Sequence, residues 1–340
     1  MTRGRSGPER APITVAAPVI AALVIVALLT IALFAPAAVA QSYPERPIRL
    51  VIPFAAGGPN DLIGRPLAEK MSEALGQPIV IENKGGAAGS IGTAFVAKAP
   101  PDGYTLLMTT GSFTGNVAIS ANPTYNPIAD FTPITLLAQS YGIVLMTRPG
   151  FPAKTLTEFV ALAKKYPGKY SYGHAGIGNV TYVAAELFQK LAGIELIKVP
   201  YRGTASFAPD IMSGHVDVGF MSTLLAQPNL QGGQLRALGI SGAQRAPPLP
   251  EVRTFQELGF KEMDVTGYFG LWFPAATPRE RVALIHREAI KALETPLLKK
   301  VLADSGVRAI GSTPDEFARF LDDDMRWQVD IIKRIGLQPQ

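Results

Sequence analysis

The chain has 340 residues, of which 47% are apolar and only 17% are charged, a composition typical of folded domains and not of disordered or coiled-coil proteins. The net charge of +5 is small and the basic residues do not cluster, so we predict no nucleic-acid partner. The chain contains no cysteine, which excludes disulfides, thiolate metal sites and cysteine nucleophiles.

The N-terminal forty residues have the pattern of an export signal. Three arginines within the first ten residues precede an apolar run over residues 13–34, and a small-x-small pattern ends at Ala40. We predict a signal peptide that is cleaved after Ala40. A retained membrane anchor is the alternative, because the apolar run is long enough to cross a bilayer of about 30 Å.

Beyond residue 43, short apolar runs alternate with amphipathic stretches, which predicts strands that alternate with helices. We expect strands at 48–54, 79–82, 105–109, 143–147, 170–173, 197–199, 216–220, 235–240 and 267–273. We expect helices at 62–75, 91–99, 159–166, 181–192, 206–213, 278–293 and 314–335. The βαβαβ order at the start indicates an α/β fold with parallel strands.

Three local features refine the predicted helices. Pro66 lies beyond the first turn of a helix that begins near Asn60, so we expect a kink or a later start there. The segments 277–280 and 313–316 both read Thr-Pro-x-Glu, which predicts a capping box with proline in the first helical position.

Three glycine-rich loops fall at strand-to-helix junctions, namely residues 55–61, 85–92 and 173–181. In parallel α/β sheets, ligands bind beyond the carboxyl ends of the strands, where helix N-termini present unpaired N–H groups and a positive dipole end. Such loops therefore make anion sites. The alternative for each loop is that its glycines only turn the chain.

Motifs of the common enzyme classes are absent from the sequence. The glycines at 86, 89 and 92 do not have dinucleotide-binding spacing, and there is no Walker loop, G-x-S-x-G or H-E-x-x-H motif. The three histidines are far apart and lack metal-ligand spacing. We therefore predict a protein that is not an enzyme, with no catalytic residue, no cofactor and no metal site.

Several long segments, in order, carry a family resemblance: YPERPIRLVIPFAAGGPND, GQPIVIENKGGAAGSIGTAFVAKAPPDGYTLLM, VPYRGTASFAPDIMSGHVDVGF and GYFGLWFPAATP. The chain from 43 to 336 resembles the receptors of tripartite tricarboxylate transporters, also called Bug proteins. The resemblance implies a periplasmic solute-binding protein with the two-lobed, type II fold, each lobe a sheet flanked by helices, and a ligand cleft between the lobes. It also implies a small organic acid as ligand and the subunits of a membrane permease as partners.

The lobes are expected to divide the chain discontinuously. We predict that lobe 1 comprises 43–140 plus 266–340 and that lobe 2 comprises 141–265, joined by crossing strands. Ligand binding would then favour hinge closure, since bound ligand touches both lobes. We expect a monomer.

The resemblance implies that the first glycine loop offers N–H groups to a ligand carboxylate and that a second loop faces it from lobe 2. The candidate ligand-binding residues of lobe 1 are Phe54, Ala56, Gly57, Gly58, Asn60, Asp61, Thr110 and Ser112. Those of lobe 2 are His174, Gly176, Gly178, Asn179, Thr181, Tyr182, Arg202 and Met221. Asp61 is expected to cap the helix, to fix the loop, or to do both.

Several residues depart from the pattern of this family. Ala56 stands where a proline is usual, Pro59 removes one N–H donor, and His174, Ala175, Ile177 and Val180 replace small polar residues. Tyr182 stands where a histidine is common, and Met221 stands where an aspartate is common. We therefore predict a ligand with one carboxylate and an apolar or aromatic body. Two other readings stay open: a receptor that presents the acid to a sensor kinase, and an exported α/β enzyme.

Overall fold

Two separate sheets organise the chain in the computed structural model, which describes Met1, Gly7 and residues 43–337. The predicted export signal and its cleavage site lie outside the described residues. Within the described residues, no helix is long and apolar enough to span a membrane, and no group of acidic or histidine side chains is arranged to hold a metal ion.

The first sheet has six strands in the order β11-β4-β10-β3-β1-β2. β1 pairs in parallel with β2 and β3, as the sequence predicted, whereas β10 runs antiparallel to both β3 and β4, so the sheet is mixed. The strands are β1 (Ile48–Ile52), β2 (Ile79–Asn83), β3 (Thr105–Thr109), β4 (Phe131–Ser140), β10 (Tyr268–Pro274) and β11 (Val307–Ala309).

The second sheet has five strands in the order β7-β6-β8-β5-β9 and is also mixed. β6 pairs in parallel with β7 and β8, and β5 runs antiparallel to β8 and β9. The strands are β5 (Ile143–Thr147), β6 (Ser171–His174), β7 (Ile197–Pro200), β8 (Val218–Ser222) and β9 (Arg236–Ile240).

The chain crosses between the sheets twice, from β4 into β5 and back from β9 to β10, which gives the two-lobed fold. The two crossing segments are bonded to each other, because Gly267 N donates to Ser140 Oγ at 2.8 Å and Ser140 N donates to Gly267 O. We call the first sheet with its helices lobe 1 and the second sheet with its helices lobe 2.

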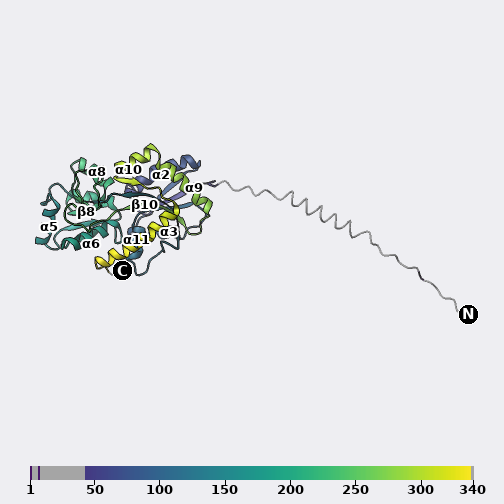
Figure 1. Ribbon diagram of the computed structural model, residues 1–340, viewed down its shortest axis with the longest axis horizontal. Coiled ribbons are helices and arrows are strands. Elements are labelled where there is room, and N and C mark those ends of the chain that lie inside the picture. The colour runs from purple at the N-terminus through teal and green to yellow at the C-terminus, as the bar shows by residue number, and fades with distance from the viewer. Residues whose placement is uncertain (2–6, 8–42, 338–340) are drawn as a thin grey trace. The chain divides into compact units, whose positions relative to one another are not determined.

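Helices flank each sheet, and Figure 1 shows α5 and α6 gathered beside β8, while α2, α3 and α9 surround β10. The helices of lobe 1 are α2 (Pro59–Leu75), α3 (Ser90–Ala97), α4 (Ser112–Ala118), α9 (Arg279–Leu293) and α10 (Pro296–Asp304), preceded at α3 by the short 3₁₀ turn η1 (Ala87–Gly89). Those of lobe 2 are α5 (Leu156–Lys165), α6 (Val180–Ala192), α7 (Thr204–Ser213) and α8 (Thr223–Gln231).

The last helix, α11 (Pro314–Arg334), contributes to both cores. Phe317 and Leu321 pack in the lobe 1 core with Trp272. Ile331 and Ile332, three to four turns later, are 3% exposed and pack among the buried side chains of lobe 2. One amphipathic helix therefore joins the lobes in addition to the crossing segments.

The helix starts agree only partly with the sequence predictions. The capping box at Thr313 and Glu316 is confirmed, with both reciprocal hydrogen bonds present. The capping box predicted at Thr277 is wrong: α9 begins at Arg279, and the Thr277 hydroxyl donates instead to Pro274 O. Of the two outcomes expected at Pro66, the late start is also wrong, because α2 begins at Pro59 and contains Pro66, and the kink stays a prediction.

Candidate functional site

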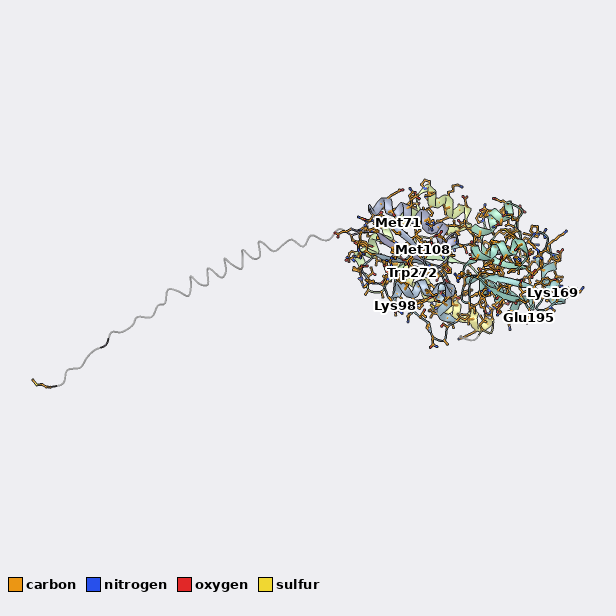
Figure 2. The ribbon with its side chains drawn as sticks, turned by 180° about the vertical axis from the view of Figure 1, so that it is seen from behind. Met71, Lys98, Met108, Lys169, Glu195 and Trp272 are labelled. Atoms are coloured by element: carbon orange, nitrogen blue, oxygen red, sulfur yellow. The ribbon has the colours of Figure 1, made fainter. Side chains whose placement is uncertain are left out.

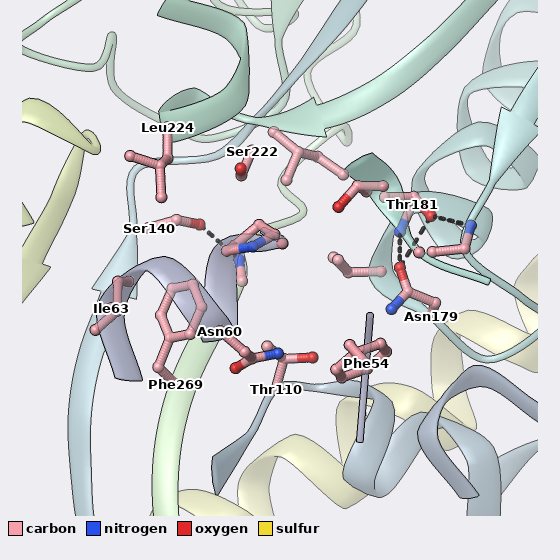
Figure 3. Close-up of a pocket in the computed structure, with 18 of the residues that line it drawn as sticks. Phe54, Asn60, Ile63, Thr110, Ser140, Asn179, Thr181, Ser222, Leu224 and Phe269 are labelled. Atoms are coloured by element: carbon pink, nitrogen blue, oxygen red, sulfur yellow. Dashed lines mark hydrogen bonds between the residues drawn. The ribbon is translucent and has the colours of Figure 1, made fainter. Parts of the chain in front are cut away.

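A cavity lies between the lobes, at the ends of the strands that precede α2, α6, α7 and α8 (Figure 3). The cavity volume is about 70 Å³, which suits a compact molecule. Lobe 1 and the crossing segments contribute Phe54, Ala55, Gly58, Pro59, Asn60, Ile63, Thr110, Ser140, Gly267, Tyr268, Phe269 and Val307. Lobe 2 contributes Ile143, Ala175, Asn179, Val180, Thr181, Gly203, Thr204, Ala205, Ser222, Thr223 and Leu224.

Four helix N-termini meet at this cavity, and none of the described residues that line it carries a charge. Each helix follows a strand directly, which brings its first turn to the carboxyl edge of the sheet. The partial positive charge of a helix N-terminus acts within its first turn, and it acts more strongly away from bulk water. The electrostatics of the cavity therefore favour an anion without any basic side chain.

The helices differ in how their first turns are capped. Asn179 Oδ1 accepts from Thr181 N at 3.0 Å in α6, and Ser222 Oγ accepts from Leu225 N at 3.4 Å in α8. In contrast, the N-caps of α2 and α7 are Gly58 and Gly203, and neither has a side chain to cap its helix. In α2, Pro59 has no N–H group and Asp61 N donates to Gly58 O, which leaves Asn60 N as the first-turn donor at the cavity. In α7, Ser206 N donates to Gly203 O, which leaves the N–H groups of Thr204 and Ala205.

Asp61 fixes the first glycine loop and does not line the cavity. Its carboxylate accepts from Gly57 N and from Arg65 Nε, both at 2.9 Å, and from Asn83 Nδ2 at 3.1 Å. Burial acts to raise the pKa of Asp61, but the hydrogen bonds from Arg65, Gly57 and Asn83 outweigh it and hold the pKa below its usual value. Of the two roles expected for Asp61, the structure shows the loop contact, since the N-cap is Gly58.

The loop of lobe 2 before α6 uses several of its own N–H groups internally. Ala175 N donates to Thr181 Oγ1 at 3.0 Å, and Gly176 N donates to His174 Nδ1 at 3.2 Å. Asn179 N donates to Gly176 O. These donors are therefore committed to the shape of the loop and not to a ligand.

His174 and Tyr182 are buried behind the cavity wall. The His174 ring lies 5.6 Å from Tyr172 and 5.0 Å from Tyr182, and burial lowers its pKa. The Tyr182 hydroxyl accepts from Lys198 Nζ at 3.3 Å. Of the two side chains, His174 is the one bonded to the loop, and Tyr182 packs against the His174 ring.

Six of the candidate residues line the cavity: Phe54, Gly58, Asn60, Thr110, Asn179 and Thr181. The others, which are not part of its wall, are Ala56, Gly57, Asp61, Ser112, His174, Gly176, Gly178, Tyr182, Arg202 and Met221. Among these, Met221 is fully buried in the core of lobe 2, Arg202 is exposed, and Ser112 lies 3.3 Å from the Thr110 hydroxyl that it supports.

The first turns of α7 and α8 and the crossing-segment residues were missed by the sequence reasoning. The sequence has a signal for α7, because Gly203 follows a predicted strand and precedes a predicted helix, as the glycines of the three glycine-rich loops do. Ser140 and Phe269 had no such signal, since they reach the cavity only through the way the lobes are joined.

Two polar side chains of the wall lack a hydrogen-bond partner within the described part of the chain. Asn60 Oδ1 and Thr223 Oγ1 are buried and unpaired, one in each lobe. Buried polar atoms in native proteins are almost always paired with protein, water or ligand. Each lobe thus has one buried polar atom at the cavity wall that is available for a hydrogen bond.

Comparison with known proteins agrees with this geometry. The model of the tripartite tricarboxylate transporter family receptor matches residues 63–337. The chain belongs to this family. The periplasmic binding protein BugD has a solved structure that is 32% identical, with a TM-score of 0.85, and the alignment covers 88% of this chain and 100% of BugD.

Two further solved structures contain a named ligand. MatC from Rhodopseudomonas palustris, with bound malate, is 32% identical with a TM-score of 0.82, over 85% of this chain and all of that one. Rpa4515 from the same organism, with adipate, is 29% identical with a TM-score of 0.84, over 88% of this chain and all of that one. The receptors of this family are solute-binding proteins and not enzymes, and the two-lobed fold is the fold that they share.

Proposed function

We propose that this receptor captures a small organic acid in the cavity between its lobes. The carboxylate would accept hydrogen bonds from the first turns of α2 and α7, which face the cavity without a capping side chain. The observation that carries the proposal is the meeting of four helix N-termini in a cavity whose described wall has no charged side chain. The acids bound by MatC and Rpa4515 support this class of ligand.

The rest of the wall suits an apolar or aromatic body. Phe54 and Phe269 face the cavity from lobe 1, and Leu224 faces it from lobe 2 (Figure 3). No described side chain of the wall is a carboxylate that could pair with an ammonium group. We therefore propose a ligand with one carboxylate and an apolar or aromatic body in preference to a tricarboxylate or an amino acid.

A thermal-shift panel tests the ligand class. Purified receptor is heated with benzoate, phenylacetate, adipate, malate, citrate or glutamate, and a ligand at one hundred times its dissociation constant adds about 2.7 kcal/mol to the free energy of unfolding. We expect stabilisation by the aromatic monoacids. Strong stabilisation by citrate together with none by the aromatic monoacids would defeat this proposal.

The variant Thr204→Pro tests the role of α7. Proline is tolerated in the first helical position, and Gly203 before it is already extended, so the helix should form while one N–H donor at the cavity is removed. We expect about tenfold weaker binding of the acid that the panel identifies. Val180→Pro is the comparison variant, because it removes the corresponding first-turn N–H group of α6, and an equal loss in both variants would contradict the assignment to α7.

We also propose that the protein is exported and cleaved after Ala40, and that its lobes comprise residues 43–140 plus 266–340 and residues 141–265. We propose that the receptor is a monomer and delivers the acid to the subunits of a membrane permease. The family description supports delivery to a transporter. Cross-linking of the acid-loaded receptor to membranes of the source cell, followed by mass spectrometry, tests this step. Recovery of a sensor kinase without any permease subunit would contradict it.

A further inference from the structure

Two glycines of the loop before α6 touch the opposite lobe instead of lining the cavity. A Cβ built on Gly176 would lie 2.8 Å from the Cβ of Ala88, and a Cβ built on Gly178 would lie 2.7 Å from Asn116 Oδ1. In return, a Cβ built on Gly115 of lobe 1 would lie 2.3 Å from Gly178 O. Real Cβ atoms essentially never come within 3.0 Å, so at this contact the two lobes meet backbone to backbone.

The lobe 1 side of this contact is in a strained conformation. Ala87 and Ala88 have φ angles of 46° and 53°, in the left-handed region that side-chain-bearing residues avoid at a cost of about 1–2 kcal/mol each. Asn116 Nδ2 holds the loop in place by donating to Ala88 O at 3.1 Å. Such strain persists where the surroundings require it, and it clusters at clamps and switch regions.

The lobe 2 side is fixed from behind by the buried His174, whose Nδ1 accepts from Gly176 N at 3.2 Å. His174 must be unprotonated on Nδ1 to accept this bond, and its burial favours the neutral ring. Both sides of the contact are thus held in shape by bonds within their own lobe.

We propose that Gly176 and Gly178, with Ala88 and Asn116, form a backbone clasp that sets the equilibrium between open and closed lobes. None of these four residues lines the cavity. The clasp therefore acts as a positioning device: it favours the closed arrangement whether or not an acid is bound. The inference rests on the two-lobed receptor assigned above, but it does not depend on which ligand the receptor takes.

The experiment measures the distance between the lobes without ligand. The chain has no cysteine of its own, so Lys98→Cys in lobe 1 and Glu195→Cys in lobe 2 provide two exposed positions for spin labels (Figure 2). Pulsed electron paramagnetic resonance then gives the distribution of distances in the protein freed of ligand by partial unfolding and dialysis. We expect a dominant short distance, and we expect Gly176→Ala to lower the ratio of short to long distances about tenfold.

A matched control separates the clash from simple backbone strain. Gly193, which ends α6 in the same lobe, also has a positive φ, of 61°, but no atom lies within 4 Å of a Cβ built there. Gly193→Ala should therefore strain the backbone without changing the distances between the lobes. An equal shift in both variants, an unchanged distribution in Gly176→Ala, or a wild-type protein that is wholly open would each overturn the proposal.

A second variant keeps the test decisive if Gly176→Ala alone unfolds lobe 2. Ala88→Gly removes the Cβ that a residue at position 176 would meet at 2.8 Å and also relieves the left-handed alanine. The pair Ala88→Gly with Gly176→Ala should recover part of the short-distance population. A pair no more closed than Gly176→Ala alone would contradict a steric clasp at this contact.

Discussion

Asp61 influences the cavity through the backbone that it holds. Its carboxylate accepts hydrogen bonds from Gly57 N, Arg65 and Asn83. Gly57 belongs to the loop that carries Gly58 and Asn60 to the cavity, so Asp61 is bonded to this loop. The glycine loop was predictable from its sequence, but this set of partners was not, because Asn83 comes from the end of another strand.

For Asp61→Asn, we expect the free energy of unfolding near neutral pH to fall by about 2 kcal/mol, since a charged hydrogen-bond acceptor is lost from a buried site. The folded-state pKa lies below the ordinary value, so the stability that Asp61 contributes is present above that value and is lost as the pH falls through the folded-state pKa. Urea unfolding at several pH values measures this. Asp304→Asn, in an exposed pair with Lys300, should change little, and an equal loss in it would contradict the prediction.

Asp324 of α11 is a partly buried carboxyl group with no cation bonded to it among the described residues. It accepts hydrogen bonds from the hydroxyls of Thr114 and Tyr268, the latter at 3.0 Å, and burial raises its pKa to about 6 despite them. Tyr268 is also one of the residues that line the cavity. Asp324 therefore connects α11 to the cavity wall.

The folded-state pKa of Asp324 is raised above the ordinary value of 3.8. The contribution of protonated Asp324 to the free energy of unfolding is therefore fully present below pH 3.8 and is lost as the pH rises through about 6. We expect Asp324→Asn to raise the free energy of unfolding by about 2–3 kcal/mol near pH 8 and by much less near pH 4. Thermal unfolding across that range measures the effect. The exposed neighbour Asp323 is the control, and a pH-independent gain in Asp324→Asn would contradict the assignment.

At the scale of elements, the sequence predicted the strands whose apolar runs are uninterrupted, such as β3 and β5. It missed β4, because Pro133 and two threonines interrupt its run, although β4 lies between β11 and β10 in the sheet. It also could not show that β10 reverses direction, since strand order depends on pairing far along the chain. As a result, the sequence did not predict that the crossing segments contribute residues to the cavity wall.

Thr313 is the cap on which the start of α11 depends. Its side chain accepts from Glu316 N, and Glu316 bonds back to Thr313 N at 2.9 Å. We expect Thr313→Ala to lower the free energy of unfolding by about 1 kcal/mol, as measured by urea denaturation. Thr313→Ser should retain the wild-type value, and equal losses in both variants would show that the cap is not the cause.

At the scale of the whole molecule, α11 makes the cores of the lobes depend on each other. Ile331 is 3% exposed and packs within the core of lobe 2, although its helix begins against lobe 1. We expect Ile331→Ala to cost about 2–5 kcal/mol of unfolding free energy and to affect lobe 2. Val329, 37% exposed on the same helix, is the control and should change by less than about 0.5 kcal/mol when replaced by alanine. A loss in Ile331→Ala no larger than in Val329→Ala would contradict the shared core.

The uncharged wall of the cavity has a consequence for how such receptors diversify. On the proposed binding mode, the carboxylate is held by main-chain atoms, which every substitution except proline leaves in place. Side chains such as Phe54, Ile63 and Leu224 are then free to be exchanged in duplicated copies of the gene. Exchange of one wall residue at a time would then change which acid fits the cavity, while the main-chain contacts to the carboxylate stay in place at every step.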